Sequence, residues 1–192
     1  MGLKDLFRLR TREEVLGSKV LVCGLGLQFQ EGVAADGGIY ERYYRSVETA
    51  MFSEIRELMD AVSRSPDIIH LFCDVSPGGE IANPNGTPVV GTELLDRCCE
   101  FNVKLLWIAS DNESGGYIAG FKARGKRMNL VMTLKRNDPK FSRFLDQILF
   151  RMFYGDTLPV AWVDVSPQIP GSTNPDLPSA IFYAGRGGVK LR

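Results

Sequence analysis

The sequence predicts an α/β protein, a three-layer α/β/α sandwich in which helices cover both faces of a mainly parallel central sheet. Short, near-continuous apolar runs recur along the chain, which is typical of strands buried on both faces. Segments whose apolar residues lie three and four positions apart alternate with these runs, as in amphipathic helices. Turn signals rich in glycine and proline separate the two kinds of segment. This alternation favours parallel strands joined by right-handed crossovers.

Composition and charge narrow the class of protein. A chain of 192 residues, 44% of them apolar and 24% charged, can form one sizeable core, so we expect a single domain over residues 1–192. Within it, residues 1–17 read as an N-terminal extension and residues 186–192 as a basic tail. Lys plus Arg and Asp plus Glu each number 23, so no net charge draws the protein to nucleic acid. No apolar run of about 18 residues indicates a membrane span.

The four cysteines, Cys23, Cys73, Cys98 and Cys99, show no C-x-x-C spacing, and three of them lie in apolar stretches. They predict free thiols in a reducing compartment, and the amino-terminal residues lack the apolar core of a signal peptide. We therefore expect a cytoplasmic protein. We expect no bound cofactor and no metal ion.

The first half of the chain begins with an apolar, β-branched run at residues 19–26 that predicts a buried strand. Residues 26–45 are rich in glycine and aromatic residues without a regular period, and they predict a long loop. From residue 46 to residue 62 the apolar positions share one helical face and predict a helix that crosses back over the sheet. These positions are Val47, Met51, Ile55, Leu58, Met59 and Val62.

The second half continues the alternation. The clearest signal is a helix with Asp138 as its cap and Pro139 in its first turn, ending at Gly155. The other predicted elements, in chain order, are a strand at 67–73, a hairpin-like excursion through the turns at 76–79 and 83–86, a helix at 93–101 capped by Thr92, a strand at 103–109, a helix at 115–124, a strand at 128–134, a helical turn or two at 158–165 and a last strand at 180–184.

Polar residues follow three of the predicted strands, at the edge where an open parallel sheet carries its chemistry. Residues 24–26 hold two glycines, Asp74 follows the strand at 67–73, and Ser110 and Asp111 follow the strand at 103–109. We expect these residues to share one edge of the sheet. This edge is the predicted functional site.

Several kinds of chemistry are open at this edge. Gly24-Leu-Gly26 resembles part of a dinucleotide-binding loop, but Phe29 stands where that fingerprint has its third glycine. Ser110 is a candidate nucleophile for a hydrolase, with Asp74 or Asp111 as its partner, although neither matches the power of an imidazole base. A hard cation between Asp74, Glu80 and Asp111 is a further alternative, but their spacing fits no known metal loop.

His70 is the single histidine, so any mechanism that uses an imidazole base must use it. It lies in the middle of an apolar run, several residues before the predicted strand end. A buried histidine that forms hydrogen bonds within the core fits this position better than a catalytic one.

Between about residue 67 and residue 185 the chain resembles the CHAT branch of the caspase-like (clan CD) cysteine peptidase fold. Ile68-Ile-His-Leu-Phe-Cys-Asp74 is similar to the strand that carries a mid-strand histidine and ends in the catalytic His-Gly. Residues 78–95 resemble the following hairpin and helix, and Leu105-Leu-Trp-Ile-Ala-Ser110 resembles the strand that ends in Ala-Cys. Residues 119–155 are similar to the family's helix, strand and long helix, and residues 180–185 to its closing strand.

The resemblance implies that the catalytic positions have changed. Asp74 stands where the family has its histidine, and Ser110 stands where it has its cysteine nucleophile. A register shift by one residue would bring Cys73 to the histidine position, but it would not restore the dyad. Loss of both the thiolate and the imidazole removes the chemistry of a cysteine peptidase.

The sequence therefore predicts a non-proteolytic, CHAT-related domain that acts as a protein-interaction or regulatory module. A protein partner is expected, and a homodimer formed through an edge strand is compatible with the fold. A hydrolase that uses Ser110 with Asp74 or Asp111, and a nucleotide-binding protein, are the two alternatives.

Overall fold

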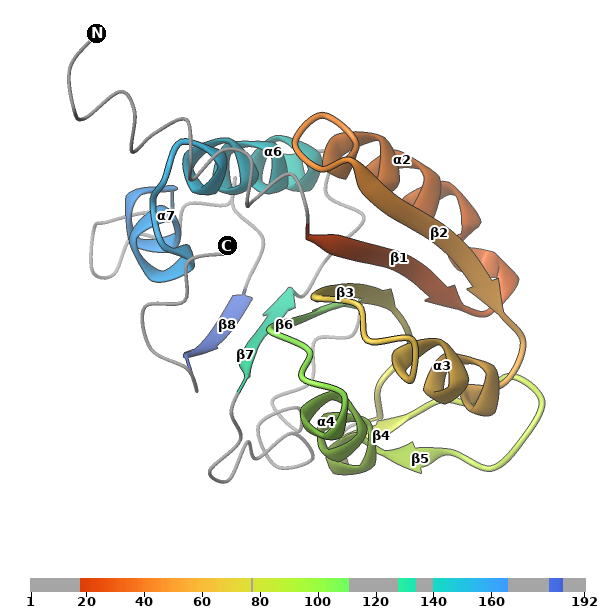
Figure 1. Cartoon of the computed structure of the whole chain (residues 1–192). Helices are drawn as coiled ribbons and strands as arrows, with labels where there is room; N and C mark the ends of the chain where they lie inside the picture. The colour runs from red at the N-terminus through yellow and green to blue at the C-terminus, as the bar shows by residue number, and fades with distance from the viewer. Residues whose placement is uncertain (1–17, 77, 111–127, 134–139, 166–179, 185–192) are drawn as a thin grey trace, which may run out of the picture.

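A computed structural model describes residues 18–76, 78–110, 128–133, 140–165 and 180–184. These residues form a six-stranded sheet with the order β2-β1-β3-β6-β7-β8 (Figure 1). The first five strands are mutually parallel, and β8 runs antiparallel to β7. The strands are β1 (Lys19–Leu25), β2 (Ser46–Phe52), β3 (Ile68–Phe72), β6 (Leu105–Ala109), β7 (Asn129–Thr133) and β8 (Ala180–Ala184).

Helices cover both faces of the sheet, as Figure 1 shows. One face carries α2 (Gln30–Tyr40), α6 (Lys140–Phe153) and α7 (Leu158–Val165), and the other carries α3 (Ile55–Val62) and α4 (Gly91–Glu100). Each face has its own apolar core, because side chains of successive strand residues point to opposite sides. The prediction of an α/β sandwich with a mainly parallel sheet is confirmed.

Most of the predicted strands lie where the apolar runs placed them. β3, β6, β7 and β8 fall within the predicted ranges, and every residue of β3 and β6 is buried. The helix predicted to end at Gly155 is α6, and Gly155 has a φ of 103°, the left-handed conformation that follows many helices. Asp138, its predicted cap, and Pro139, predicted in its first turn, lie outside the described residues, as does the helix predicted at 115–124.

The prediction of a long loop at residues 26–45 is wrong. A short 3-10 helix η1 (Leu27–Phe29) leads directly into α2. Glycines weaken a helix, but here they let it lie close to the sheet: a Cβ on Gly32 would meet Phe72 at 2.8 Å, and one on Gly37 would meet Thr49 at 2.6 Å. Packing against the sheet therefore outweighs the poor helix propensity of this segment.

The prediction of one helix over residues 46–62 is also wrong in its first half. Residues 46–52 form the edge strand β2, and only residues 55–62 are helical. A capping box starts α3, in which the Glu57 side chain accepts hydrogen bonds from the backbone N–H groups of Ser53 (2.7 Å) and Glu54 (3.2 Å). These bonds also lower the pKa of Glu57. The two residues of the capping box are Glu54 and Glu57, three positions apart.

A small hairpin separates β3 from α4. Its strands β4 (Glu80–Ile81) and β5 (Val89–Val90) pair antiparallel, as the turn signals predicted. Asn83 connects the hairpin to α3, because its Oδ1 accepts a hydrogen bond of 3.1 Å from the backbone N–H of Ile55. The following helix α4 begins at Gly91 with Val90 before it, so the predicted cap at Thr92 is wrong by two residues.

Candidate functional site

Three neighbouring strands end at the predicted functional edge. β1, β3 and β6 lie side by side in parallel, and they lead respectively to Gly26, to Asp74 and to Ser110. The last paired residues of β3 and β6 are Phe72 and Ala109, and the backbone N–H of Cys73 donates to the Ala109 carbonyl at 3.2 Å. The structure thus brings the strand ends together, as expected for parallel strands.

The register decides which side chains share a face of the sheet. Because Phe72 pairs with Ala109, the next position along the two strands sets Cys73 beside Ser110, and not Asp74 beside Ser110. Cys73 belongs to the core under α3 and α4, whereas Phe72 belongs to the core under α2 and α6. Ser110 is also buried, with 1% of its surface exposed. In this register Asp74 lies one residue beyond the position beside Ser110.

Asp74 is half-buried and lies next to the loop that follows β1. The Gln28 side-chain amide donates to its carboxylate at 3.4 Å. The carbonyl of Asp74 accepts a hydrogen bond of 2.9 Å from the N–H of Ala82, which holds the start of the hairpin excursion. Asp74 thus joins η1 to the β4–β5 hairpin at the carboxyl edge.

Two glycines shape the turn after β1. Gly26 has a φ of 112°, a conformation that side chains with a Cβ rarely adopt, and its N–H donates to the Phe52 carbonyl at 2.9 Å. Gly24 allows close packing, because a Cβ there would meet Met51 at 2.7 Å and Phe29 at 2.9 Å. The space beside Gly26 is filled by the Gln28 side chain.

The β1-α2-β2 unit has two features of a dinucleotide-binding unit. A helix does follow Gly26 within a few residues, and the crossover closes over residues 19–52, close to the roughly 30 residues of that fingerprint. The local charge is unfavourable for a phosphate, however. Glu31 lies in the first turn of α2, and the Asp74 carboxylate lies beside Gln28.

His70 lies at the centre of the core under α2, and its side chain is fully buried. Its Nδ1 is 3.2 Å from the Tyr40 hydroxyl, and its Nε2 is 3.3 Å from Oδ2 of the buried Asp36. The ring also stacks on Trp107 and on Phe72. This arrangement places the Tyr40 hydroxyl at Nδ1 and the Asp36 carboxylate beside Nε2, so both ring nitrogens face a polar group inside the core.

Sequence reasoning missed the partners of His70. Asp36 and Tyr40 both lie on α2, in the segment predicted to be a loop, so no helical spacing drew attention to them. Along α2 they are four residues apart, which places both on the face that meets β3. The missed residue at the edge is Gln28, for the same reason.

The thiols near the site are protonated. Burial is the main cause that raises the pKa of Cys73 well above its usual value, and the nearby Asp74 carboxylate raises it further. Burial likewise raises the pKa of Cys23 and of Cys98. A thiolate nucleophile is therefore disfavoured at each of these positions.

The remaining candidate residues do not form a described site. Asp111 lies outside the described residues, and Glu80 is exposed on β4. Over the described ranges no group of three His, Cys, Asp or Glu side chains is arranged to hold a metal ion. Asp74 and Glu80, the two described members of the possible cation cluster with Asp111, therefore give it no support.

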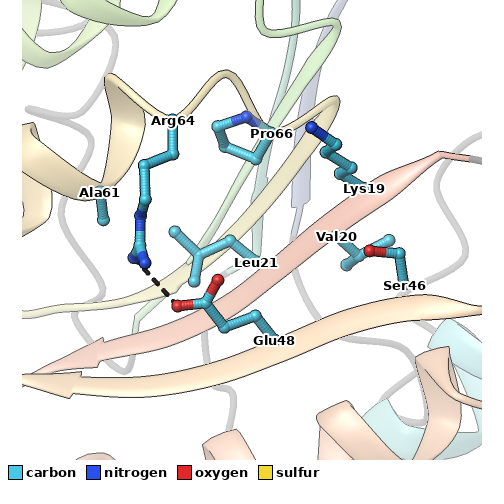
Figure 2. Close-up of a pocket in the computed structure, with 8 residues that line it drawn as sticks. All are labelled: Lys19, Val20, Leu21, Ser46, Glu48, Ala61, Arg64 and Pro66. Atoms are coloured by element: carbon cyan, nitrogen blue, oxygen red, sulfur yellow. Dashed lines mark ion pairs between the residues drawn. The ribbon is translucent and has the colours of Figure 1, made fainter.

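A pocket lies at the opposite, amino-terminal end of β1 and β2 (Figure 2). Its volume is about 170 Å³. Arg64 and Glu48 face each other across it and form an ion pair of 2.9 Å. Both side chains are more than half exposed, so the pair contributes little to stability. The lining residues are Lys19, Val20, Leu21, Ser46, Glu48, Ala61, Arg64 and Pro66.

Two further findings bear on the class of protein. None of the helices in the described segments is long and apolar enough to cross a bilayer. Comparison of the chain with protein-family models and with curated proteins gave no match.

Proposed function

We propose that this chain is a non-proteolytic, caspase-like and CHAT-related domain that works by binding another protein. The observation that carries the proposal is the composition of the carboxyl edge: a half-buried Asp74 and a buried Ser110 stand at the two positions where the resemblance expects histidine and cysteine. In the register of β3 and β6, Cys73 lies beside Ser110, and Asp74 lies one residue further along the chain. A nucleophile and its base must lie within hydrogen-bond reach of each other.

The order of the elements supports the resemblance. The strand that contains His70 is followed by a hairpin, a helix, the strand that ends at Ser110, a further strand, a long helix and a closing strand. This order agrees with the resemblance over the described residues, while the helix that the resemblance places from residue 119 lies outside them and α7 adds a further helix before the closing strand. The histidine in the middle of its strand has a structural role here, since Tyr40 and Asp36 hold it inside the core.

The hydrolase alternative has less support. Ser110 is buried, its neighbour across the strands is the protonated Cys73, and the one imidazole of the chain is enclosed in the core. The nucleotide alternative is weakened by the two carboxylates beside the Gly24–Gly26 turn. A thermal-shift screen in which no nucleotide raises the melting temperature would exclude nucleotide binding.

We also propose a reducing, cytoplasmic setting for this domain. All four cysteines are free, and three of them are buried as small apolar side chains. Free thiols of this kind are typical of proteins that do not depend on disulfides. Partners other than proteins, such as nucleic acid, are not favoured by a net charge of zero.

The experiment combines activity probes with two variants of the site. The purified protein is assayed against peptide libraries, and it is treated with thiol-directed and fluorophosphonate probes. We expect no turnover, no labelling of Ser110 and no change in Ser110→Ala. The double variant Asp74→His/Ser110→Cys should also stay inactive, because the side chain at position 110 is buried. Turnover that Ser110→Ala abolishes would overturn the proposal.

A further inference from the structure

β2 is an edge strand of the sheet, and in the described part of the chain no strand pairs with its outer edge. It is seven residues long and has no proline to block pairing. A strand edge of this length is a template for a further strand. The outer edge of β2 is therefore a candidate interaction surface.

The hydrogen bonds to β1 show which backbone groups of β2 are free to pair outward. The carbonyl of Phe52 points toward β1, because it accepts from Gly26 N–H at 2.9 Å. Successive residues of a strand point their backbone groups in opposite directions. Ser46, Glu48 and Ala50 thus also face β1, whereas the remaining residues present their N–H and C=O groups at the outer edge. These residues are Val47, Thr49 and Met51.

We propose that the outer edge of β2 pairs with the same strand of a second copy of this chain, antiparallel and about a two-fold axis at Thr49. Thr49 then lies opposite Thr49 of the second copy, and Val47 lies opposite Met51 on both sides of the axis. All three outward-facing residues exchange both of their backbone bonds, which gives about six hydrogen bonds. The two sheets become one continuous sheet.

The charge of Glu48 and the length of β2 select this axis over its neighbours. An axis at Glu48 would set two glutamates directly opposite each other, offset only by their exposed ion pairs with Arg64, and it would place Met51 opposite Arg45, which lies before the start of the strand. An axis at Ala50 would place Val47 opposite Ser53, which lies beyond the end of the strand. Only the axis at Thr49 pairs every outward residue while Glu48 meets Ala50. A strand that complements itself in this way fits a second copy, as a closed two-fold interface requires.

The side chains around the edge favour close approach. Val47 and Met51 are half-buried and pack on the core under α2, so their pairing would join the cores of the two copies. Between Glu31 and Glu41 the exposed residues of α2 are all small: Ala34, Ala35 and Gly38. Stable interfaces bury about 1,200–2,000 Å², more than one strand provides. The small residues let α2 and its copy add to the contact over the paired strands.

This inference goes beyond the proposed function, because β2 is not part of the carboxyl edge. A failure of the pairing would leave the assignment of Asp74 and Ser110 unchanged. Likewise, enzymatic activity at Ser110 would not affect the pairing.

The first test is the oligomeric state of the full chain by light scattering and sedimentation. We expect a dimer for the natural sequence. Thr49→Pro removes an outward N–H and should weaken the dimer by about tenfold or more, whereas Thr49→Val should leave it intact. Thr49→Lys is the second test variant, for the case that the proline variant does not fold. It keeps the backbone N–H but sets two positive charges opposite each other on the axis, so it should also weaken the dimer. Circular dichroism melts show whether each variant is folded.

The second test fixes the axis by cross-linking under mild oxidation. Thr49→Cys should form a covalent dimer, because its two copies lie opposite each other at a distance that suits a disulfide. Glu48→Cys and Ala50→Cys, one residue to either side, should not cross-link to themselves. A monomer at all concentrations up to about 100 μM, well above typical dimer affinities, would overturn the proposal. So would a dimer that persists in folded Thr49→Pro and Thr49→Lys, or cross-linking at residue 48 or 50.

Discussion

The imidazole of His70 lies flat against the indole of Trp107, with their ring centroids 5.4 Å apart and 7° between their planes. The two residues are direct neighbours on β3 and β6, where His70 pairs with Trp107. The stacked pair fills the middle of the core under α2 and α6. His70 therefore serves packing as well as hydrogen bonding.

The first prediction concerns the buried contacts of His70. His70→Leu leaves the Asp36 carboxylate buried without the imidazole, and it should lower the free energy of unfolding by about 3–5 kcal/mol. Tyr40→Phe removes one hydrogen bond and should cost only about 1 kcal/mol. Urea unfolding of the variants measures both. The double variant Asp36→Leu/His70→Leu should be more stable than His70→Leu alone, and the reverse order would contradict this account.

A second prediction compares two glycines. Gly24→Ala places a methyl group within 2.7–3.1 Å of Met51, Phe29 and Val33, so it should destabilise the protein by about 1–3 kcal/mol. Gly38→Ala is the matched control, because nothing lies within 4 Å of its Cβ position in α2, and it should stabilise by about 0.5–1 kcal/mol. Thermal unfolding of both variants checks the signs, and equal effects would rule out the packing role of Gly24.

The third prediction is the reactivity of the thiols. Cys23, Cys73 and Cys98 are buried, and burial raises the pKa of each, whereas Cys99 is partly exposed. Iodoacetamide at pH 8 should therefore modify Cys99 first, as read by mass spectrometry of peptides. All four should react after unfolding in urea. Rapid labelling of Cys73 in the folded protein would show an open, ionised thiol at the carboxyl edge.

The same thiols predict a loss of stability at alkaline pH. In the unfolded chain a thiol ionises near pH 9, its ordinary value, while in the folded protein the three buried thiols stay protonated. Their contribution to the free energy of unfolding is complete below pH 9. Above pH 9 the free energy of unfolding falls by about 1.4 kcal/mol per pH unit for each thiol. Urea unfolding at pH 7.5 and pH 10 measures the difference. Cys73→Ala should make the decrease smaller, and an unchanged stability at pH 10 would contradict the prediction.

The sequence predicted the inner part of the fold well, for a physical reason. β3 and β6 are buried on both faces, so their apolar runs are continuous and hard to mistake. β2 lies at the edge, where polar residues such as Glu48 and Thr49 are tolerated, and its few apolar residues happened to continue the spacing of α3. α2 was missed because its glycines argue against a helix until the sheet beneath them is known.

The sequence predicted that Asp74 and Ser110 follow neighbouring strand ends, but it did not predict their register or their contacts. The carboxyl ends of parallel strands share one edge, so the grouping of Asp74 and Ser110 followed from the strand assignments alone. The offset of Asp74 by one residue from the position beside Ser110 depends on the pairing of Phe72 with Ala109, and no sequence pattern fixes that register. Gln28, the contact of Asp74, lay in the segment predicted as a loop.

The position of β8 has a consequence for synthesis of the chain. β7 ends at Thr133, but the strand that pairs with it begins only at Ala180. A ribosome adds about 5–20 residues per second, so for several seconds the nascent sheet exposes the unpaired backbone of β7. Chaperone binding during translation would protect this side. A chain cut short before Ala180 should accumulate as aggregates rather than as a slightly less stable monomer.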